Sequence, residues 1–390
     1  EVTRKAVPSA VVSFAVKNER DAGGIMITAS HNPPAWNGFK INGDYGGSAF
    51  AEITQAVEAE LAKITAPPAF ANTKVNTFDP DKDYLAALEK LVNLSAIKRS
   101  DITVIVDPMF GSGSGYIPAL LPKAIEIRGQ RDPLFGGVNP EPIAKNLAFT
   151  MQWMKGRKFR KPALCIVLDG DADRIGGVDE QGNYLNSHHI FVLLLYFLVK
   201  HRKAQGKIIK TFNITSKVDL LCKKHGLELL EVPIGFKYIC AHMLKEYILI
   251  GGEESGGMGI RGHVPERDGI LAGLMLLELM AKERLPISKI LKNIMADVGP
   301  FYYDRLDLTL DKEKIASIKA KLKENPPTKI AGKKIVDIKT LDGFKFLFAD
   351  GSWVLFRPSG TEPLLRIYVE APSAADVKKI LAAAAVIGTK

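Results

Sequence analysis

Short apolar runs typical of buried strands alternate with longer helical runs along most of this chain, and no other feature constrains its fold as strongly. ITVIVDP (residues 102–108) and ALCIVLDG (163–170) have the composition of buried strands. IFVLLLYFLVK (190–200) and DGILAGLMLLELMAKE (268–283) have the length and pattern of helices. This order is typical of α/β layers, so we predict an α/β fold with mixed sheets.

The pattern divides the chain into four segments. Residues 1–76, 79–183 and 184–299 are predicted to be three similar α/β domains. A stretch rich in proline and small polar residues (64–83) indicates a linker after the first of them. After DVGPFYYDR (297–305) the pattern changes to a Lys-rich helix, two or three strands and a terminal helix. Residues 300–390 are therefore predicted to form a smaller α+β domain.

Composition limits the class of protein. The chain has 390 residues, 46% hydrophobic and 25% charged, which is typical of a globular protein of several domains. Three widely spaced cysteines favour a reducing compartment, and no signal peptide or membrane-spanning run is recognisable. We therefore expect a cytoplasmic protein, a monomer or homodimer, with no membrane partner. The net charge of +10 allows nucleic acid, an anionic surface or phosphorylated small molecules as partners. Because the lysines are dispersed, we expect no nucleic-acid partner.

The stretch GGIMITASHNPPAWNGFKI (23–41) combines an apolar run with an abrupt stop. Two consecutive prolines exclude continuation as a helix or a central strand. Ser30 is therefore expected at the C-terminal tip of a buried strand, the edge of an α/β sheet where ligands collect. Its hydroxyl could be a nucleophile or a phosphate carrier, and an ordinary turn is the alternative.

A second stretch, ALCIVLDGDADRIGGVDE (163–180), places three carboxylates on alternate positions after a buried strand. Asp169, Asp171 and Asp173 would repel one another unless a cation neutralised them, so Mg²⁺ or Ca²⁺ is implied. An EF-hand is excluded because Arg174 stands where the calcium loop needs glycine. A phosphatase with Asp169 as nucleophile stays open, and so does a solvated acidic turn.

Two further loops carry polar groups. RPSGTEP (357–363) offers a guanidinium, two hydroxyls and glycine-exposed backbone, which together suit a phosphate. GGEESGG (251–257) places carboxylates and a hydroxyl on a flexible glycine loop, which suits a polyhydroxylated ligand; a mobile surface loop is the alternative. Taken together, the four stretches indicate one phosphorylated, sugar-like substrate.

TASHNP with NGFK, DGDADR, GGEESGG and RPSGTEP, in this order, resemble the four signature loops of the α-D-phosphohexomutase family. The resemblance covers nearly the whole chain. It implies three α/β domains and a smaller TBP-like domain around a central cleft. It also implies an isomerase that moves phosphate between the 1- and 6-positions of a hexose, with glucose 1,6-bisphosphate or an equivalent hexose bisphosphate as activator.

Roles of single residues follow from the resemblance position by position. Ser30 would be the phosphoserine, and it would bind Mg²⁺ together with the three aspartates. His31, Lys40 and Arg174 are expected among the catalytic residues, with Lys40 assisting proton transfer. The residues expected to contact the substrate are Lys237 in GFKYI, Glu253, Ser255, Arg357, Ser359, Gly360 and Thr361.

The resemblance has departures and leaves the hexose open. Family members carry an earlier strand and an arginine-containing segment before the match begins, so the first domain is expected to be incomplete here. The stretch LLPKAIEIRGQRDPLFGG (120–137) is also shorter than the family pattern. Glu254 between Glu253 and Ser255 resembles the residue of phosphoglucomutases, whereas phosphoglucosamine mutases, the main alternative, tend to have Gln there. A metal-dependent aspartyl phosphatase is the alternative of another class.

Overall fold

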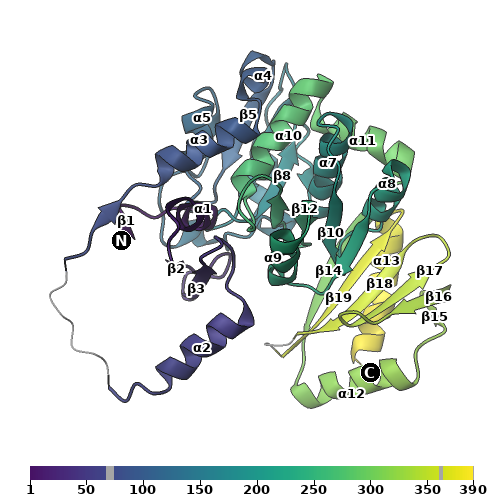
Figure 1. The fold of residues 1–390 in the computed structure, drawn as a ribbon. Helices are drawn as coiled ribbons and strands as arrows, with labels where there is room; N and C mark the ends of the chain where they lie inside the picture. The colour runs from purple at the N-terminus through teal and green to yellow at the C-terminus, as the bar shows by residue number, and fades with distance from the viewer. Residues whose placement is uncertain (67–73, 360–362, 390) are drawn as a thin grey trace. The chain divides into compact units, whose positions relative to one another are not determined.

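The computed structural model describes residues 1–66, 74–359 and 363–389 (Figure 1). The described residues form two compact units. The first contains residues 1–210, 227–230 and 235–291, and the second contains residues 211–226, 231–234 and 292–390. No helix within the described ranges is long and apolar enough to cross a membrane.

The N-terminal segment is built around a short hairpin. Helix α1 (Ser9–Glu19) leads into β2 (Gly23–Ile27), which pairs antiparallel with β3 (Phe39–Gly43); α2 (Ala51–Leu61) follows. Strand β1 (Val2–Thr3) pairs in parallel with β4 (Thr77–Phe78). The prediction that Ser30 follows a buried strand is wrong. Ile25 and Ile27 of β2 are 61% and 62% exposed, because the described residues leave their face of the strand largely uncovered.

The second segment contains the sheet that carries the three aspartates. Its strand order within the described residues is β6 (Ile125–Glu126), β5 (Thr103–Asp107), β7 (Ala163–Leu168), β8 (Ile175–Asp179) and β9 (Tyr184–Leu185). Its helices are α3 (Asp81–Leu91), α4 (Leu94–Arg99), α5 (Tyr116–Leu120) and α6 (Ala148–Lys155). All six residues of β7 are buried, as its continuous apolar run predicts. Strands β7 and β8 are antiparallel neighbours, so the turn 169–174 joins them directly.

The third segment also has a mixed sheet. In the described part of the chain its order is β11 (Leu229–Val232), β10 (Lys207–Thr211), β12 (Ile248–Gly252) and β13 (Met258–Ile260). Its helices are α7 (Ser187–Lys200), α8 (Lys217–His225), α9 (Phe236–Lys245), α10 (Gly269–Glu283) and α11 (Ile287–Val298). Helix α10 is buried over most of its length and contacts β7, β8 and α7. This packing ties the second and third segments together within the first unit.

The C-terminal segment is a sheet backed by helices, and neighbouring strands within its described part are antiparallel. Its strand order among the described residues is β14 (Tyr302–Thr309), β19 (Leu364–Ala371), β18 (Trp353–Pro358), β17 (Phe344–Phe348), β16 (Lys333–Lys339) and β15 (Lys329–Ile330). Helices α12 (Lys312–Glu324) and α13 (Ala374–Thr389) complete it, and both contribute to its apolar core (Figure 1). The sequence predicted two or three strands here, and this number is too low. Strand β16, KKIVDIK, is rich in lysine and mostly exposed, so it lacks an apolar signal.

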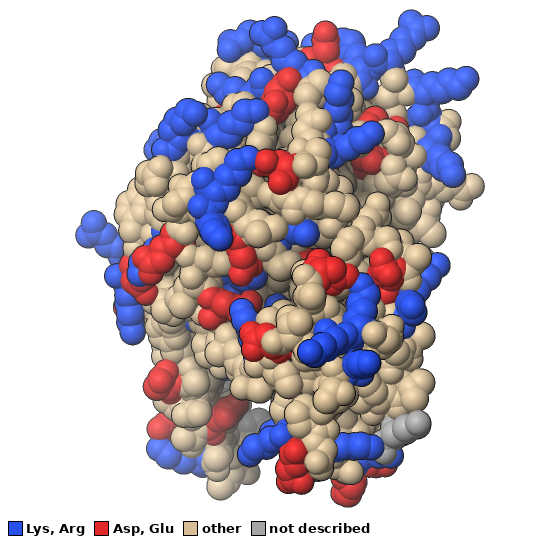
Figure 2. Space-filling view, turned by 90° about the vertical axis from the view of Figure 1, so that its right-hand side faces the viewer, with Lys and Arg blue, Asp and Glu red and all other residues tan. Residues whose placement is uncertain are grey.

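Surface charge is unevenly distributed on the face drawn in Figure 2. Lys and Arg side chains are numerous toward the top of that view, whereas across its middle they lie among Asp and Glu side chains. The excess of positive charge is therefore partly offset by neighbouring acidic side chains on this face. The expectation that the protein has no nucleic-acid partner stays a prediction.

Candidate active site

The turn that carries Ser30 has a strained, close-packed backbone. Ser30 adopts φ 53°, a left-handed conformation that is uncommon for a residue with a side chain. Its backbone N–H donates to Thr28 Oγ1 at 2.8 Å. A Cβ on Gly170 would lie 2.4 Å from the Ser30 carbonyl oxygen, so only glycine lets the two turns approach this closely. The serine is thus held directly against the turn between β7 and β8.

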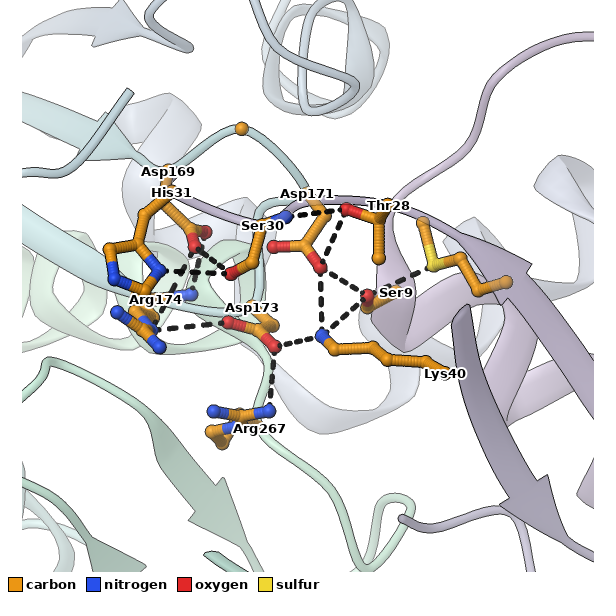
Figure 3. Close-up of polar contacts among 12 residues, drawn as sticks. Ser9, Thr28, Ser30, His31, Lys40, Asp169, Asp171, Asp173, Arg174 and Arg267 are labelled. Carbon is orange, nitrogen blue, oxygen red and sulfur yellow. Dashed lines mark hydrogen bonds and ion pairs between the residues drawn. The ribbon is translucent and has the colours of Figure 1, made fainter. Parts of the chain in front are cut away.

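That turn brings the three predicted metal ligands together. Asp169, Asp171 and Asp173 are each at most 1% exposed, and one oxygen from each lies within 4.8 Å of the others. Ser30 Oγ donates to Asp169 Oδ2 at 3.2 Å (Figure 3). The structure therefore places the candidate phosphate carrier and the three carboxylates in one cluster.

The electrostatics of this cluster fit a divalent cation. Burial raises the pKa of Asp169 well above its usual range, and the Asp171 and Asp173 carboxylates raise it further. Asp171 Oδ1 and Asp173 Oδ1 are buried and have no hydrogen-bond partner among the described residues. Buried carboxylate oxygens without partners are rare in folded proteins, and oxygen atoms are the ligands that Mg²⁺ and Ca²⁺ prefer. The residues present therefore fit a hard divalent metal ion.

Lys40 approaches the cluster from strand β3. It lies opposite Met26 in the β2–β3 register, and its Nζ donates at 2.8 Å to one oxygen each of Asp171 and Asp173. Nζ is also 3.2 Å from Ser9 Oγ. Although burial alone would lower the pKa of Lys40, the two carboxylates raise it above its ordinary value. Lys40 is therefore an ammonium group in this arrangement, and its charged nitrogen lies beside Asp171 and Asp173.

His31 and Arg174 also reach the cluster. His31 Nδ1 lies 3.5 Å from Ser30 Oγ, and burial, followed by the nearby Arg174 charge, lowers the pKa of His31 to about 3. The imidazole is therefore neutral near pH 7. The Arg174 Nε atom lies 3.9 Å from Asp169 Oδ2 and 3.7 Å from Asp173 Oδ1. Both side chains are placed where a phosphoryl group on Ser30 could meet them.

The loop GGEESGG (251–257), which was expected to contact sugar hydroxyls, forms a packed turn between β12 and β13. Glu253 is 6% exposed, and burial raises its pKa. The alternative of a mobile surface loop is therefore wrong for Glu253. The Ile175 N–H donates to the Gly256 carbonyl at 3.0 Å, which brings this turn beside the aspartate turn. Ser255 Oγ is buried without a hydrogen-bond partner in the described part of the chain.

The sequence did not identify several residues that complete the cluster. Arg267 Nη2 lies 2.9 Å from Asp173 Oδ2, its Nη1 lies 3.5 Å from Glu253 Oε2, and its Nε lies 3.1 Å from Glu266 Oε1. Ser9 Oγ donates to Asp171 Oδ2 at 2.8 Å, and so does Thr28 Oγ1 at 3.3 Å. The only signal in the sequence was the charged run ERD (266–268) just before a long apolar helix.

Lys237 does not join this cluster. It lies in the first turn of α9, where its Nζ is 5.2 Å from the Tyr238 ring centroid. Among the described residues it makes no hydrogen bond or ion pair with the aspartates. A substrate contact for Lys237 stays a prediction.

The candidate phosphate loop belongs to the second unit. Arg357 lies near the end of β18, and its Nε is 3.1 Å from Asp342 Oδ2. The Ser359 N–H donates to the Leu364 carbonyl at 2.8 Å, which closes the loop at its base. Gly360 and Thr361 lie outside the described residues.

Comparison with known protein families matches nearly all of the chain. Models of the phosphoglucomutase/phosphomannomutase α/β/α domains I, II and III match residues 2–68, 82–182 and 186–298. The model of the C-terminal domain of the same family matches residues 309–386. These matches confirm the predicted fold class of three α/β domains and a smaller C-terminal domain. The exact limits predicted for the domains stay predictions.

Individual relatives agree with this assignment. A phosphoglucomutase/phosphomannomutase from Thermococcus kodakarensis is 30% identical over 386 residues, which cover 96% of this chain and 80% of that protein. A phosphoglucosamine mutase from Methanococcus vannielii is 32% identical, covering 94% and 80% of the two chains. A crystal structure from Thermus thermophilus, assigned to phosphomannomutase, is 35% identical with a TM-score of 0.86, covering 99% and 82%. The chain belongs to the α-D-phosphohexomutases, the enzyme family of the phosphoglucomutases and phosphomannomutases.

Proposed function

We propose that the protein interconverts hexose 1-phosphate and hexose 6-phosphate through a phosphate carried on Ser30 and a hexose 1,6-bisphosphate intermediate. The observation that carries this proposal is the 3.2 Å contact between Ser30 Oγ and Asp169 Oδ2 at the edge of three buried carboxylates. A serine in that place can hold a phosphoryl group beside a metal site, which an ordinary turn does not provide.

The three aspartates and the phosphoryl oxygens on Ser30 would hold Mg²⁺. The ion would offset negative charge on the group being transferred. Support comes from Asp171 Oδ1 and Asp173 Oδ1, which accept no hydrogen bond among the described residues, and from the pKa of Asp169, which burial and the neighbouring Asp171 and Asp173 carboxylates raise. A hexose bisphosphate would serve as the activator that restores the phosphate on Ser30.

The chain's own groups account for the protons. When phosphate passes from Ser30 to a sugar hydroxyl, the serine P–O bond breaks, a sugar P–O bond forms, and the hydroxyl proton ends on the serine oxygen. We assign Lys40 to hold that proton in transit, because its Nζ lies in the cluster. If bound Mg²⁺ neutralised Asp171 and Asp173, the pKa of Lys40 would fall toward the range in which its amine can accept a proton. His31, neutral and next to Ser30, is suited to accept or donate a hydrogen bond there.

Substrate positioning falls to the remaining loops. Glu253 offers a carboxylate to sugar hydroxyls, and Ser255 offers a hydroxyl that has no hydrogen-bond partner within the described ranges. We assign the phosphate that is not reacting to Arg357, Ser359, Gly360 and Thr361. Because each end of the sugar must reach Ser30 in turn, the same loops must accept the substrate in two orientations. The proposed substrate is a phosphorylated hexose, with glucose 1-phosphate preferred, since Glu254 resembles the residue of phosphoglucomutases.

Two rival activities are separated by assay. Purified protein is incubated with Mg²⁺, a trace of glucose 1,6-bisphosphate and a panel of hexose phosphates. Conversion of glucose 1-phosphate without release of inorganic phosphate supports the proposal, and net phosphate release with phosphate found on Asp169 indicates the phosphatase instead. A higher kcat/KM for glucosamine 6-phosphate than for glucose 1-phosphate would assign the enzyme to phosphoglucosamine mutases and leave the phosphoserine mechanism standing.

A further inference from the structure

Asp342 makes two directed contacts with one carboxylate oxygen. Its Oδ2 atom accepts a hydrogen bond from Arg357 Nε at 3.1 Å and one from the Ile234 backbone N–H at 2.8 Å. The side chains of Asp342 and Arg357 are only 23% and 16% exposed. All three residues belong to the second unit. The pair is therefore partly shielded from water, unlike an exposed ion pair.

The sheet fixes where Asp342 lies. Strands β17 and β18 are antiparallel, with Phe344 opposite Phe356, so the register places Gly343 beside Arg357. Gly343 has φ 106°, and a Cβ there would lie 2.4 Å from the Phe356 carbonyl oxygen and 3.1 Å from Arg357 Cα. Only glycine allows this approach. The backbone conformation at Gly343 therefore places the Asp342 carboxylate next to Arg357.

The contact at Nε determines which N–H donors of the Arg357 guanidinium remain for a phosphate. A guanidinium has five N–H donors in one plane, and two parallel donors can bind two phosphate oxygens at once. With Nε bound to Asp342, the two terminal nitrogens of Arg357, which donate to no other group among the described residues, stay available for such a fork. Arg366 lies directly opposite Arg357 in the β18–β19 register, on the same face of the sheet. The carboxylate also offsets the repulsion expected between two cations in this position.

The second contact reaches a different loop. Ile234 immediately precedes Gly235, the capping residue before α9, and Lys237 lies in the first turn of that helix. One carboxylate oxygen thus joins the arginine of the candidate phosphate loop to the backbone that leads into a second predicted substrate-contact segment. A change of orientation at Arg357 therefore requires this shared oxygen to break one of its two hydrogen bonds.

We propose that Asp342 is a positioning residue for phosphate binding: it holds Arg357 by Nε so that the terminal nitrogens face the substrate phosphate, and it couples this arginine to the Ile234 backbone. This inference rests on the proposed function, since that proposal assigns a substrate phosphate to Arg357. Asp342 acts through Arg357 and does not itself touch the substrate.

The test compares Asp342→Ala and Asp342→Asn with the wild type, using glucose 6-phosphate as the probe. Its Kd is measured by calorimetry and its KM and kcat by the mutase assay. Asp342→Ala should raise Kd and KM about tenfold, the scale of one charge-assisted hydrogen bond, while kcat falls less. Asp342→Asn keeps an oxygen acceptor and should recover part of the affinity, and it serves as the folded variant where the alanine does not fold. The control is Asp350→Asn, which removes a carboxylate paired with Lys333 at the other end of strand β17 and should leave Kd unchanged.

A double-mutant cycle separates positioning from general stability. In an Arg357→Ala background, Asp342→Ala should weaken binding by less than about twofold further, because the group it positions is gone. An equal loss of affinity in both backgrounds, or an unchanged Kd in Asp342→Ala, would overturn the inference.

Failure of the proposed function would give a different result. The wild type would then convert no hexose phosphate, and calorimetry would still report whether Asp342 supports phosphate binding; a wild type that neither binds nor converts glucose 6-phosphate would reject both proposals.

Discussion

Replacement of Arg267 by Gln should destabilise the first unit strongly, because this buried guanidinium compensates three carboxylates. Its nitrogens lie 2.9 Å from Asp173, 3.5 Å from Glu253 and 3.1 Å from Glu266, and its side chain is only 11% exposed. Removing one partner from a buried ion pair typically costs about 3–5 kcal/mol, since the remaining charge is left uncompensated. Asp173 keeps Lys40 at 2.8 Å, so we expect the lower end of this range, about 3 kcal/mol.

The assay is amide hydrogen exchange read by mass spectrometry, because a chain of several domains has no single free energy of unfolding. Peptides from α10, which begins two residues after Arg267, should exchange about a hundredfold faster in Arg267→Gln than in the wild type. The matched control is Arg99→Gln at the exposed end of α4, which should stay within about 0.5 kcal/mol of the wild type. Added Mg²⁺ should reduce the difference in exchange rate between Arg267→Gln and the wild type, because it would neutralise Asp173. Exchange as slow in Arg267→Gln as in Arg99→Gln would refute this electrostatic account.

Two further substitutions test the metal site and the phosphate loop. Asp171→Asn should raise the Mg²⁺ concentration for half-maximal activity by at least about tenfold, because it removes one of three clustered carboxylates; a magnesium titration with the same half-point as the wild type would contradict the assignment. Arg357→Lys keeps the charge but loses the planar fork, so KM for glucose 1-phosphate should rise about tenfold, and steady-state kinetics like those of the wild type would place the phosphate contact elsewhere.

The parts of the fold that could be predicted are those with a strong local pattern. Strand β7 is six apolar residues in succession, and α10 is a long apolar helix begun by the capping residue Asp268. The clustering of carboxylates in the turn after β7 could be predicted because Asp169, Asp171 and Asp173 lie within five residues, where they repel one another wherever the chain folds. Strands such as β16, which is mostly exposed and rich in lysine, give no comparable signal.

The parts that could not be predicted depend on contacts between distant residues. Arg267 contacts Asp173, which lies 94 positions earlier in the sequence, and no residue next to either one indicates that they pair. The exposed face of β2 was missed for a related reason. An apolar run predicts burial, but whether Ile25 and Ile27 are covered depends on what packs against the strand. Asp342 gives no local signal in the sequence, because its contact with Arg357 depends on the pairing of β17 with β18, which places the neighbouring Gly343 opposite Arg357.

The most direct test of the central claim is the location of the phosphate. The protein is incubated with glucose 1,6-bisphosphate and Mg²⁺ and analysed by intact-mass measurement and peptide mapping, beside Ser30→Ala. We predict one acid-stable phosphate, about 80 Da, on the peptide that contains Ser30. The Ser30→Ala protein should carry none and should lose at least about a thousandfold in mutase turnover while remaining folded. Phosphate on Asp169 in place of Ser30, or near-normal turnover in Ser30→Ala, would contradict the carrier role from which the proposed mechanism is built.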